Sequence, residues 1–321
     1  MTWRTGQNRF LCRSIRGIPF PKGAAALQII LHIGAHKTAS THLQLAMARA
    51  RRALQGHEVA YFGPDELRRK GLGVPEYLSA PTDDPLQAGR IRAALAVPCR
   101  RLVLSDENLL GNAHNVELIH TARLYDRAVV RLSRLAALLP AGQVVLALAI
   151  RNPAGFLASA YAQRLMSGKL ETYAEYARGL DPSRLCWCDL LERVQSAMPG
   201  ATYHVWRYED YPANAPDVLR ALLGEAASVA RPGLGVAHPG LSARAHEVLM
   251  NEAAALAGQG EEAIRVRVKE LRVAWPKGAQ HPGLQPHDAA TLQRADAAYA
   301  QDCARIASLR GVCALWSERH D

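Results

Sequence analysis

Short, nearly continuous apolar runs alternate with longer amphipathic stretches along the first two-thirds of the chain. Continuous apolar strands are typical of a parallel sheet that is covered on both faces, and helices between them indicate βαβ units. We therefore predict an α/β fold in three layers, with a central, mostly parallel sheet flanked by helices. The expected strands are 27–33, 58–62, 102–105, 144–150 and 202–206. The expected helices are 43–54, about 85–96, about 116–139, 154–167 and about 183–197.

The pattern changes after residue 206, where helical stretches follow one another without further strand-like runs. Because no second set of strands is visible, we expect these helices to pack on the same sheet as one helical portion. They are expected at 215–223, 240–257, 260–273 and 287–309. The expected organisation is a basic N-terminal arm, an α/β core and a C-terminal helical portion packed on the core, at 1–24, 25–225 and 226–321.

Composition bounds the answer without choosing a function. The chain has 321 residues, of which 49% are hydrophobic, and a net charge of +10. Such a charge fits a solvated basic surface, and it also fits attraction to a nucleotide, an acidic glycan, nucleic acid or a membrane surface. No apolar run approaches the roughly 20 residues of a membrane span. The six cysteines form no C-x-x-C pair, so we expect free thiols and no metal. Free thiols indicate a reducing compartment, so the expected location is the cytoplasm. Contact of the basic arm with the inner face of a membrane is left open.

The stretch that follows the first apolar run carries the strongest chemical signal. A buried strand, a tight turn with one lysine and the start of a helix aim backbone N–H groups, a cation and the helix dipole at one spot, which suits a phosphate or a sulfate. The first acidic residue of the chain is Glu58, so nothing nearby in sequence repels an anion. A Walker loop would need glycine at 31 and 36. The turn reads His36-Lys37-Thr38-Ala39-Ser40-Thr41-His42.

A second anion corner is expected where the run 144–150 ends. Asn152 is a good N-cap and Pro153 suits the first helical position, which places Arg151 at the mouth of a helix. Arginine can hold a phosphate with two parallel hydrogen bonds, and Ser159, about two turns along the helix, adds a hydroxyl. Ligands gather at the carboxyl ends of strands in such sheets, so the two corners belong to one site.

Together these residues resemble the PAPS-dependent sulfotransferases, bacterial members included, where PAPS is 3′-phosphoadenosine 5′-phosphosulfate. The turn is similar to their 5′-phosphosulfate loop, H-K-T-G-T-T, and Arg151 with Ser159 is similar to their 3′-phosphate site. The resemblance implies a P-loop-like fold, PAPS as donor, PAP as product and no metal. It implies that the nucleotide is bound by Lys37, Thr38, Ala39, Ser40, Thr41, His42, Arg151 and Ser159, with Lys277 and Gly278 in a late loop.

Two departures from the family loop bear on this expectation. Ala39 stands where a glycine is usual, which requires a negative φ at that position. His42 stands where serine or threonine is common, so its contact with the donor is open. Tyr208-Glu209-Asp210 also matches a Y-E-D of the family, which helps to build the floor of the site.

The resemblance also implies the chemistry, an in-line displacement at sulfur in which Lys37 stabilises the leaving oxygen and a carboxylate is the general base. Bacterial relatives commonly have S-x-E after the third strand, so we expect Glu107 to be the base. Asp106 is its rival, and His114 and His120 are reserve candidates. The expected partners are a nucleotide and a hydroxyl-bearing acceptor, with a glycan or glycolipid favoured; the sequence does not predict the oligomeric state.

Two alternatives come from other classes of protein. In a magnesium-dependent, kinase-like phosphotransferase, 102–106 would be a Walker B strand and Asp106 would hold the metal; the missing glycines and an arginine placed for a third phosphate argue against it. A non-enzymatic polyanion-binding module would use the positive surface. No aromatic-interleaved basic patch or recognition helix supports that, and we expect no nucleic-acid partner.

Overall fold

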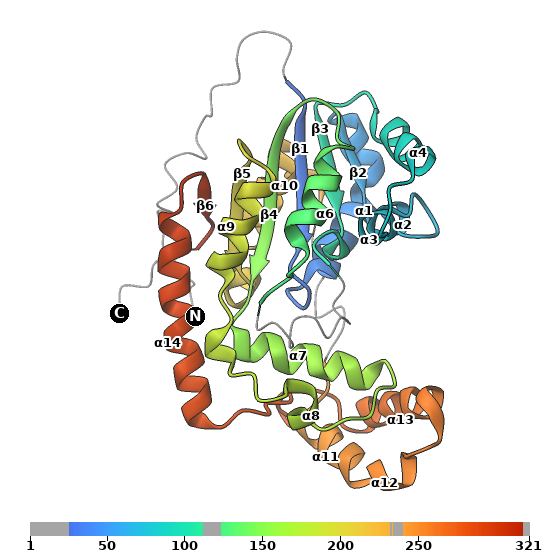
Figure 1. Cartoon of the computed structure of the whole chain (residues 1–321), viewed down its shortest axis with the longest axis vertical. Coiled ribbons are helices and arrows are strands. Elements are labelled where there is room, and N and C mark those ends of the chain that lie inside the picture. The colour runs from blue at the N-terminus through green and yellow to red at the C-terminus, as the bar shows by residue number, and fades with distance from the viewer. Residues whose placement is uncertain (1–25, 112–122, 232, 234–239, 317–321) are drawn as a thin grey trace, which may run out of the picture.

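The protein is built on one six-stranded sheet whose strands all run parallel, in the order β2-β3-β1-β4-β5-β6 (Figure 1). The computed structural model describes residues 26–111, 123–231, 233 and 240–316. All five expected strands form, so the prediction of a mostly parallel sheet is confirmed. The strands are β1 Gln28–Gly34, β2 Val59–Phe62, β3 Arg101–Ser105, β4 Gln143–Ile150, β5 Thr202–Arg207 and β6 Val312–Ala314.

Strand β6 was not expected, because three residues make too short a run to stand out in the pattern. It pairs with β5 at the edge of the sheet, through Val312, Cys313 and Ala314. It lies in the portion 226–321, which we expected to be helical throughout. The prediction is therefore wrong for these three residues, and the division of the chain at 225 stays a prediction.

Helices cover both faces of the sheet, as the continuous apolar strands predict. In β1, Ile29, Leu31 and Ile33 face one core cluster and Ile30 faces the other. The first cluster is covered by α4 Pro85–Leu95, α6 Ala128–Ala136, α9 Trp187–Ala197 and α14 Ala289–Ser308. The second is covered by α1 Ser40–Gly56, α10 Tyr211–Leu223 and η4 Gly224–Val229. The three-layer arrangement is thus confirmed.

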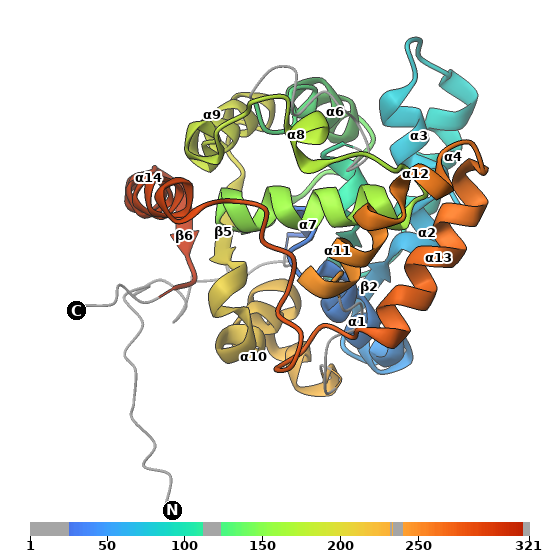
Figure 2. The same ribbon diagram turned by 90° about the horizontal axis from the view of Figure 1, so that it is seen from below.

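A smaller group of helices extends from the carboxyl ends of the strands and packs around α7 Pro153–Met166 (Figures 1 and 2). A third apolar cluster joins Tyr161 and Leu165 of α7 to Leu249, Ile264 and other residues of these helices. The group consists of α8 Tyr173–Ala177, α11 Ala243–Asn251, α12 Ala253–Leu256 and α13 Gly260–Ala274. Helix α7 therefore connects this group with the sheet.

The remaining elements are short. The expected helix 240–257 is divided at Glu252 into α11 and α12. Of the helix expected at about 116–139, α6 begins only at Ala128, and residues 116–122 lie outside the described part. Within the described part, no helix has both the length and the apolar character that crossing a membrane requires. The short elements are α2 Pro64–Leu67, α3 Val74–Ser79, η1 Glu107–Leu109, η2 Pro182–Arg184 and η3 Tyr208–Asp210.

Candidate active site

The turn between β1 and α1 is tight and left-handed at two positions. Lys37 has φ 63° and Ala39 has φ 64°. The hydroxyls of Thr38 and Ser40 both donate to the carbonyl of Ala35, at 2.5 and 3.2 Å, and close the turn from inside. The expectation of a negative φ at Ala39 is therefore wrong: the chain enters α1 through a left-handed N-cap, and the surrounding contacts hold alanine there at a cost of about 1–2 kcal/mol.

Lys37 is a half-buried cation beside a second half-buried cation, Arg151. Its Nζ donates to Oε1 of Gln163 at 3.1 Å, and its carbonyl accepts a hydrogen bond from Nη1 of Arg151 at 2.7 Å. Burial lowers the pKa of Lys37, and the positive charge of Arg151 lowers it further. Among the described residues, neither Lys37 nor Arg151 has an ion-pair partner. The loop of β1 and the end of β4 thus present two desolvated charges of the same sign.

Arg151 is held by its surroundings at the carboxyl end of β4. Its guanidinium lies 4.4 Å from the ring centroid of Tyr208, and the indole Nε1 of Trp187 donates to its carbonyl at 2.7 Å. A Cβ placed on Gly155 would come within 3.3 Å of Nε of Arg151, so the guanidinium lies along α7 where that helix lacks a side chain. Burial lowers the pKa of Arg151 as well.

One face of α7 runs past both cations. Gly155, Ser159 and Gln163 are spaced by four residues and therefore share a face of the helix. Gly155 contacts Arg151 and Gln163 contacts Lys37, so the half-buried Ser159 lies between the two contact points. The structure thus brings together Lys37, Arg151 and Ser159, which are 122 positions apart at most along the sequence.

The Y-E-D segment supports the start of α7. Glu209 accepts the backbone N–H of Asn152 at 2.8 Å and the hydroxyl of Tyr299 at 3.1 Å. The side chain of Asn152 accepts from the N–H of Ala154 at 3.0 Å, as an N-cap does. Tyr208, through its ring, and Glu209, through the backbone of Asn152, therefore fix the position of Arg151.

Other expected donor-binding residues lie elsewhere. Nδ1 of His42 is 2.7 Å from the hydroxyl of Tyr211, and Nε2 is 2.7 Å from the carbonyl oxygen of Gly233. Lys277 packs over Gly283 within its own loop, and the N–H of Gly278 donates to the carbonyl of His281 at 2.9 Å. The described contacts of Lys277 and Gly278 are thus with residues of their own loop.

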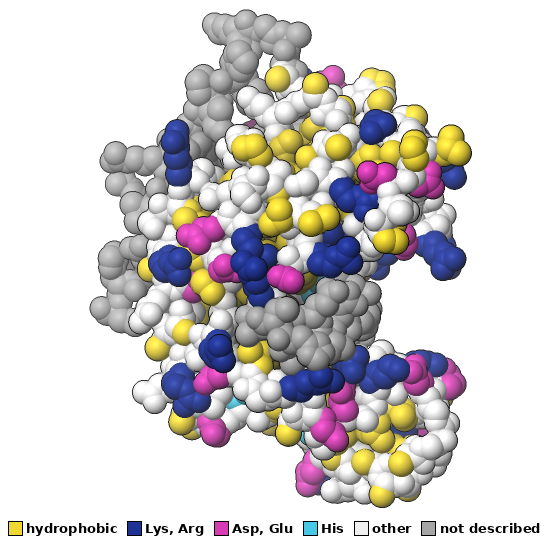
Figure 3. Space-filling model, viewed as in Figure 1, with side chains coloured by type: hydrophobic (Ala, Val, Ile, Leu, Met, Phe, Trp, Pro, Cys, Tyr) yellow, Lys and Arg dark blue, Asp and Glu magenta, His cyan; other side chains and the backbone are white. Residues whose placement is uncertain are grey.

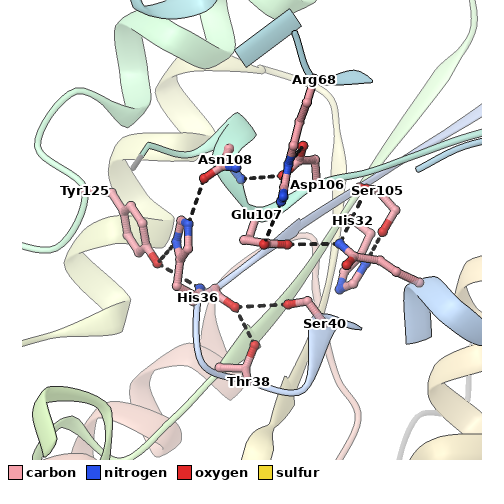
Figure 4. Close-up of polar contacts among 12 residues, drawn as sticks. His32, His36, Thr38, Ser40, Arg68, Ser105, Asp106, Glu107, Asn108 and Tyr125 are labelled. Atoms are coloured by element: carbon pink, nitrogen blue, oxygen red, sulfur yellow. Dashed lines mark hydrogen bonds and ion pairs between the residues drawn. The ribbon is translucent and has the colours of Figure 1, made fainter. Parts of the chain in front are cut away.

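The two candidate carboxylates differ in exposure, although both are bound by Arg68 (Figure 4). The Asp106 side chain is fully buried, and its oxygens accept from Nη2 and Nε of Arg68 at 2.9 and 2.8 Å. The Glu107 side chain is 18% exposed; it accepts from Nη2 of Arg68 at 2.8 Å and from the amide of Gln44 at 2.9 Å. Of the two carboxylates, only that of Glu107 is in contact with solvent. His114 and His120 lie outside the described residues.

Glu107 is an ionised carboxylate at neutral pH. Burial alone would raise its pKa, but the charge that His36 carries when it is protonated, the hydrogen bond from Gln44 and the charge of Arg68 together hold it below the usual 4.5. Gly34 lets the end of β1 approach this side chain, because a Cβ at Gly34, whose φ is +100°, would lie 2.8 Å from Cβ of Glu107. The end of β1 that leads into the Lys37 loop and the residue that carries the carboxylate are therefore in direct contact.

Comparison with known proteins adds one structural likeness. No family model and no curated protein matches this chain. Among solved structures, the crystal structure of a sulfotransferase from Alicyclobacillus acidocaldarius is similar, with a TM-score of 0.41 and 12% identity over 76% of this chain and 98% of that chain. The likeness is to a bacterial sulfotransferase. At this identity and TM-score it says nothing of the substrate or of the site residues of this chain.

Sequence reasoning missed several residues that line the site. Gln163 follows Ser159 by one helical turn, so helical spacing was a signal that could have found it. Arg68 had no such signal, because it stands in a turn beside Arg69 and Lys70, where a solvated basic run is the ordinary interpretation. Gln44 stands two residues after the end of the turn, at His42, but its contact with Glu107 could not be read from the sequence.

Proposed function

We propose that this chain is a PAPS-dependent sulfotransferase that moves a sulfuryl group from PAPS to a hydroxyl acceptor. The observation that supports this most is the pair Lys37 and Arg151, two half-buried cations that lie side by side and have no ion-pair partner among the described residues. Such a pair is costly while nothing binds between its members, and an anion with two separated acidic groups relieves the repulsion. PAPS has such groups in its 5′-phosphosulfate and its 3′-phosphate.

The residues divide the donor between two corners. Lys37 and the backbone of Thr38, Ala39 and Ser40 would hold the 5′-phosphosulfate at the start of α1, where Thr41 and His42 add the positive end of the helix. Arg151 and Ser159 would hold the 3′-phosphate. Because the His42 ring contacts Tyr211 and Gly233, its contribution would come from its place in the first helical turn. Lys277 and Gly278 contribute only if their loop closes over the nucleotide.

Transfer then needs one proton acceptor and one stabilised leaving group. As the acceptor oxygen forms its bond to sulfur, its proton passes to the Glu107 carboxylate and the bond from sulfur to the bridging oxygen of the donor breaks. The electron pair stays on the 5′-phosphate of PAP, where the Lys37 ammonium offsets the growing negative charge. The lowered pKa of Glu107 keeps it ionised, and therefore able to take the proton, at neutral pH.

Titration calorimetry with PAP and with ATP tests the donor site. We expect Lys37→Ala and Arg151→Ala to weaken PAP binding at least 10-fold, since each removes a charge-assisted contact of about 1.5–3 kcal/mol. Arg164→Ala is the matched control on the same helix, because Arg164 is already paired with Glu171 at 2.7 Å; its PAP affinity should change less than about threefold. Heat with ATP and none with PAP would instead favour the kinase-like phosphotransferase.

Transfer of labelled sulfate from PAPS tests the chemical step. Glu107→Gln should bind PAP normally and lose turnover by about 100-fold or more, because an amide cannot take the proton. Activity that a metal chelator abolishes would contradict the metal-free mechanism. Full turnover in Glu107→Gln would move the base to another residue.

The acceptor is proposed to be a hydroxyl on a glycan or a glycolipid. An indentation separates the α/β part from the helical group, and Lys and Arg side chains gather along its rim (Figure 3). Basic side chains at a cleft raise the local concentration of acidic acceptors. A panel of acidic glycans, neutral glycans, glycolipids and simple phenols, each tested for sulfate transfer, would decide; sulfation of phenols alone would contradict this proposal.

A further inference from the structure

The buried imidazole of His36 links the Lys37 loop to the segment that carries Glu107 (Figure 4). The backbone N–H of His36 donates to the hydroxyl of Tyr125 at 3.0 Å, and Nδ1 lies 2.9 Å from the same hydroxyl. Nε2 lies 3.1 Å from the side-chain amide of Asn108. Both ring nitrogens are therefore engaged, and their partners decide where the imidazole carries its proton.

The Asn108 amide fits this network in one of its two orientations. With its oxygen toward His36, its nitrogen faces only donors, because Arg68 lies on the other side. With the nitrogen toward His36, it donates to Nε2 at 3.1 Å, and the oxygen accepts from Nη2 and Nε of Arg68 at 3.2 Å each. The second orientation satisfies every group, and we assign it on that ground. Nε2 is then an acceptor, so His36 is neutral and carries its proton on Nδ1, facing Tyr125.

The network continues from Asn108 to the carboxylate. Arg68, which the Asn108 oxygen now holds, is the ion-pair partner of both Asp106 and Glu107. A proton added to Nε2 of His36 would point at the Asn108 nitrogen. The amide would have to turn, and its N–H₂ group would then face the Arg68 guanidinium. The protonation state of His36 thus reaches Glu107 through two intervening side chains.

We propose that neutral His36 is a positioning residue that holds the Arg68–Glu107 pair in its catalytic arrangement. The inference rests on the proposed function, in which Glu107 is the base. The charged or titratable groups around His36 include Glu107 on η1, Tyr125 ahead of α6, Lys37 in its own loop and Arg68 behind Asn108. Protonation of His36 should therefore reduce turnover and leave nucleotide affinity unchanged.

The pH profile of kcat separates His36 from Glu107. An ordinary imidazole titrates at a higher pH than an ordinary glutamate. A loss of turnover on the acid side that comes from His36 should therefore disappear when a side chain that does not titrate replaces it. His36→Gln places an amide oxygen near the Nε2 position and cannot be protonated. It should keep kcat at pH 7.5 within about threefold and abolish this loss. Asn108→Asp places a carboxylate beside Nε2, favours the protonated ring and should shift the loss to higher pH by about one unit.

Nitrogen-15 NMR of the imidazole gives a readout that needs no activity. At pH 7.5 the signals of His36, assigned by comparison with His36→Gln, should show a neutral ring protonated on Nδ1. A ring protonated on Nε2, an acid limb that persists in His36→Gln, or a loss of PAP affinity in that variant as large as its loss of kcat would each overturn the inference. Failure of the wild-type protein to bind PAP would refute the proposed function. The tautomer of His36 is read from the NMR signals without PAP, so its failure would refute only the role given to His36.

Discussion

Removal of the Arg68 side chain is expected to destabilise the protein through Asp106. The Asp106 carboxylate is fully buried, whereas the Arg68 side chain that binds both of its oxygens is 40% exposed. Breaking a fully buried ion pair by removing one partner costs about 3–5 kcal/mol. Water can reach the space that Arg68 leaves, and Asp106 keeps the hydrogen bond from the N–H of Asn108 at 2.9 Å. We therefore expect Arg68→Ala to lower the free energy of unfolding by about 2–3 kcal/mol.

Urea unfolding at pH 7 measures this change against a matched pair. Arg51 and Glu66 form an ion pair of 2.7 Å with side-chain exposures of 35% and 32%, so Arg51→Ala should cost no more than about 1 kcal/mol. The double variant Arg68→Ala, Asp106→Asn should recover much of the loss, because a neutral amide is less costly to bury. If Arg68→Ala costs no more than Arg51→Ala, the buried carboxylate is not held as described and the reasoning fails.

Three further predictions follow from single residues. Burial lowers the pKa of His32 to about 4, so on acidification the unfolded chain binds a proton near pH 6.5 that the folded chain does not bind. The wild-type protein should therefore lose about 3 kcal/mol of stability between pH 6.5 and 4. In His32→Gln, the urea concentration at the midpoint of unfolding should depend much less on pH over that range. Ala39→Gly removes the side chain that makes the left-handed φ of this residue unfavourable, and calorimetric melting should show up to about 1 kcal/mol of added stability. A loss of stability in this variant would contradict the strain. Tyr208→Leu removes the ring beneath Arg151 and should weaken PAP binding about threefold to tenfold by titration calorimetry, with unchanged affinity refuting the contact.

The parts of the fold that the sequence predicts are those with a local signal. Each long strand is a continuous apolar run, and the two anion corners stand directly after such runs, so parallel pairing brings Lys37 and Arg151 to the same edge of the sheet. Strand β6 lacks such a signal because only three residues pair. The sequence also did not predict the left-handed φ of Ala39, since contacts from other residues hold alanine in a conformation that glycine would adopt more readily.

The parts of the site that the sequence does not predict depend on pairing between distant segments. Arg68 lies 38 positions from Asp106, and Tyr125 lies 89 positions from His36. Neither pair has a spacing that a helix or a strand would impose. The difference in burial between Asp106 and Glu107 likewise needed the fold, because the sequence of two adjacent acidic residues does not show which one the turn buries.

The hydrogen bond between Arg151 and the carbonyl of Lys37 spans 114 positions of the chain. During synthesis, Lys37 leaves the ribosome long before Arg151, and the early loop has no second cation with which to share a ligand. Under the proposed function, the nucleotide would therefore have nothing to recognise until β4 has joined β1 and α7 has been made. A donor that binds only the assembled sheet stabilises the finished protein by mass action and does not help to start its folding.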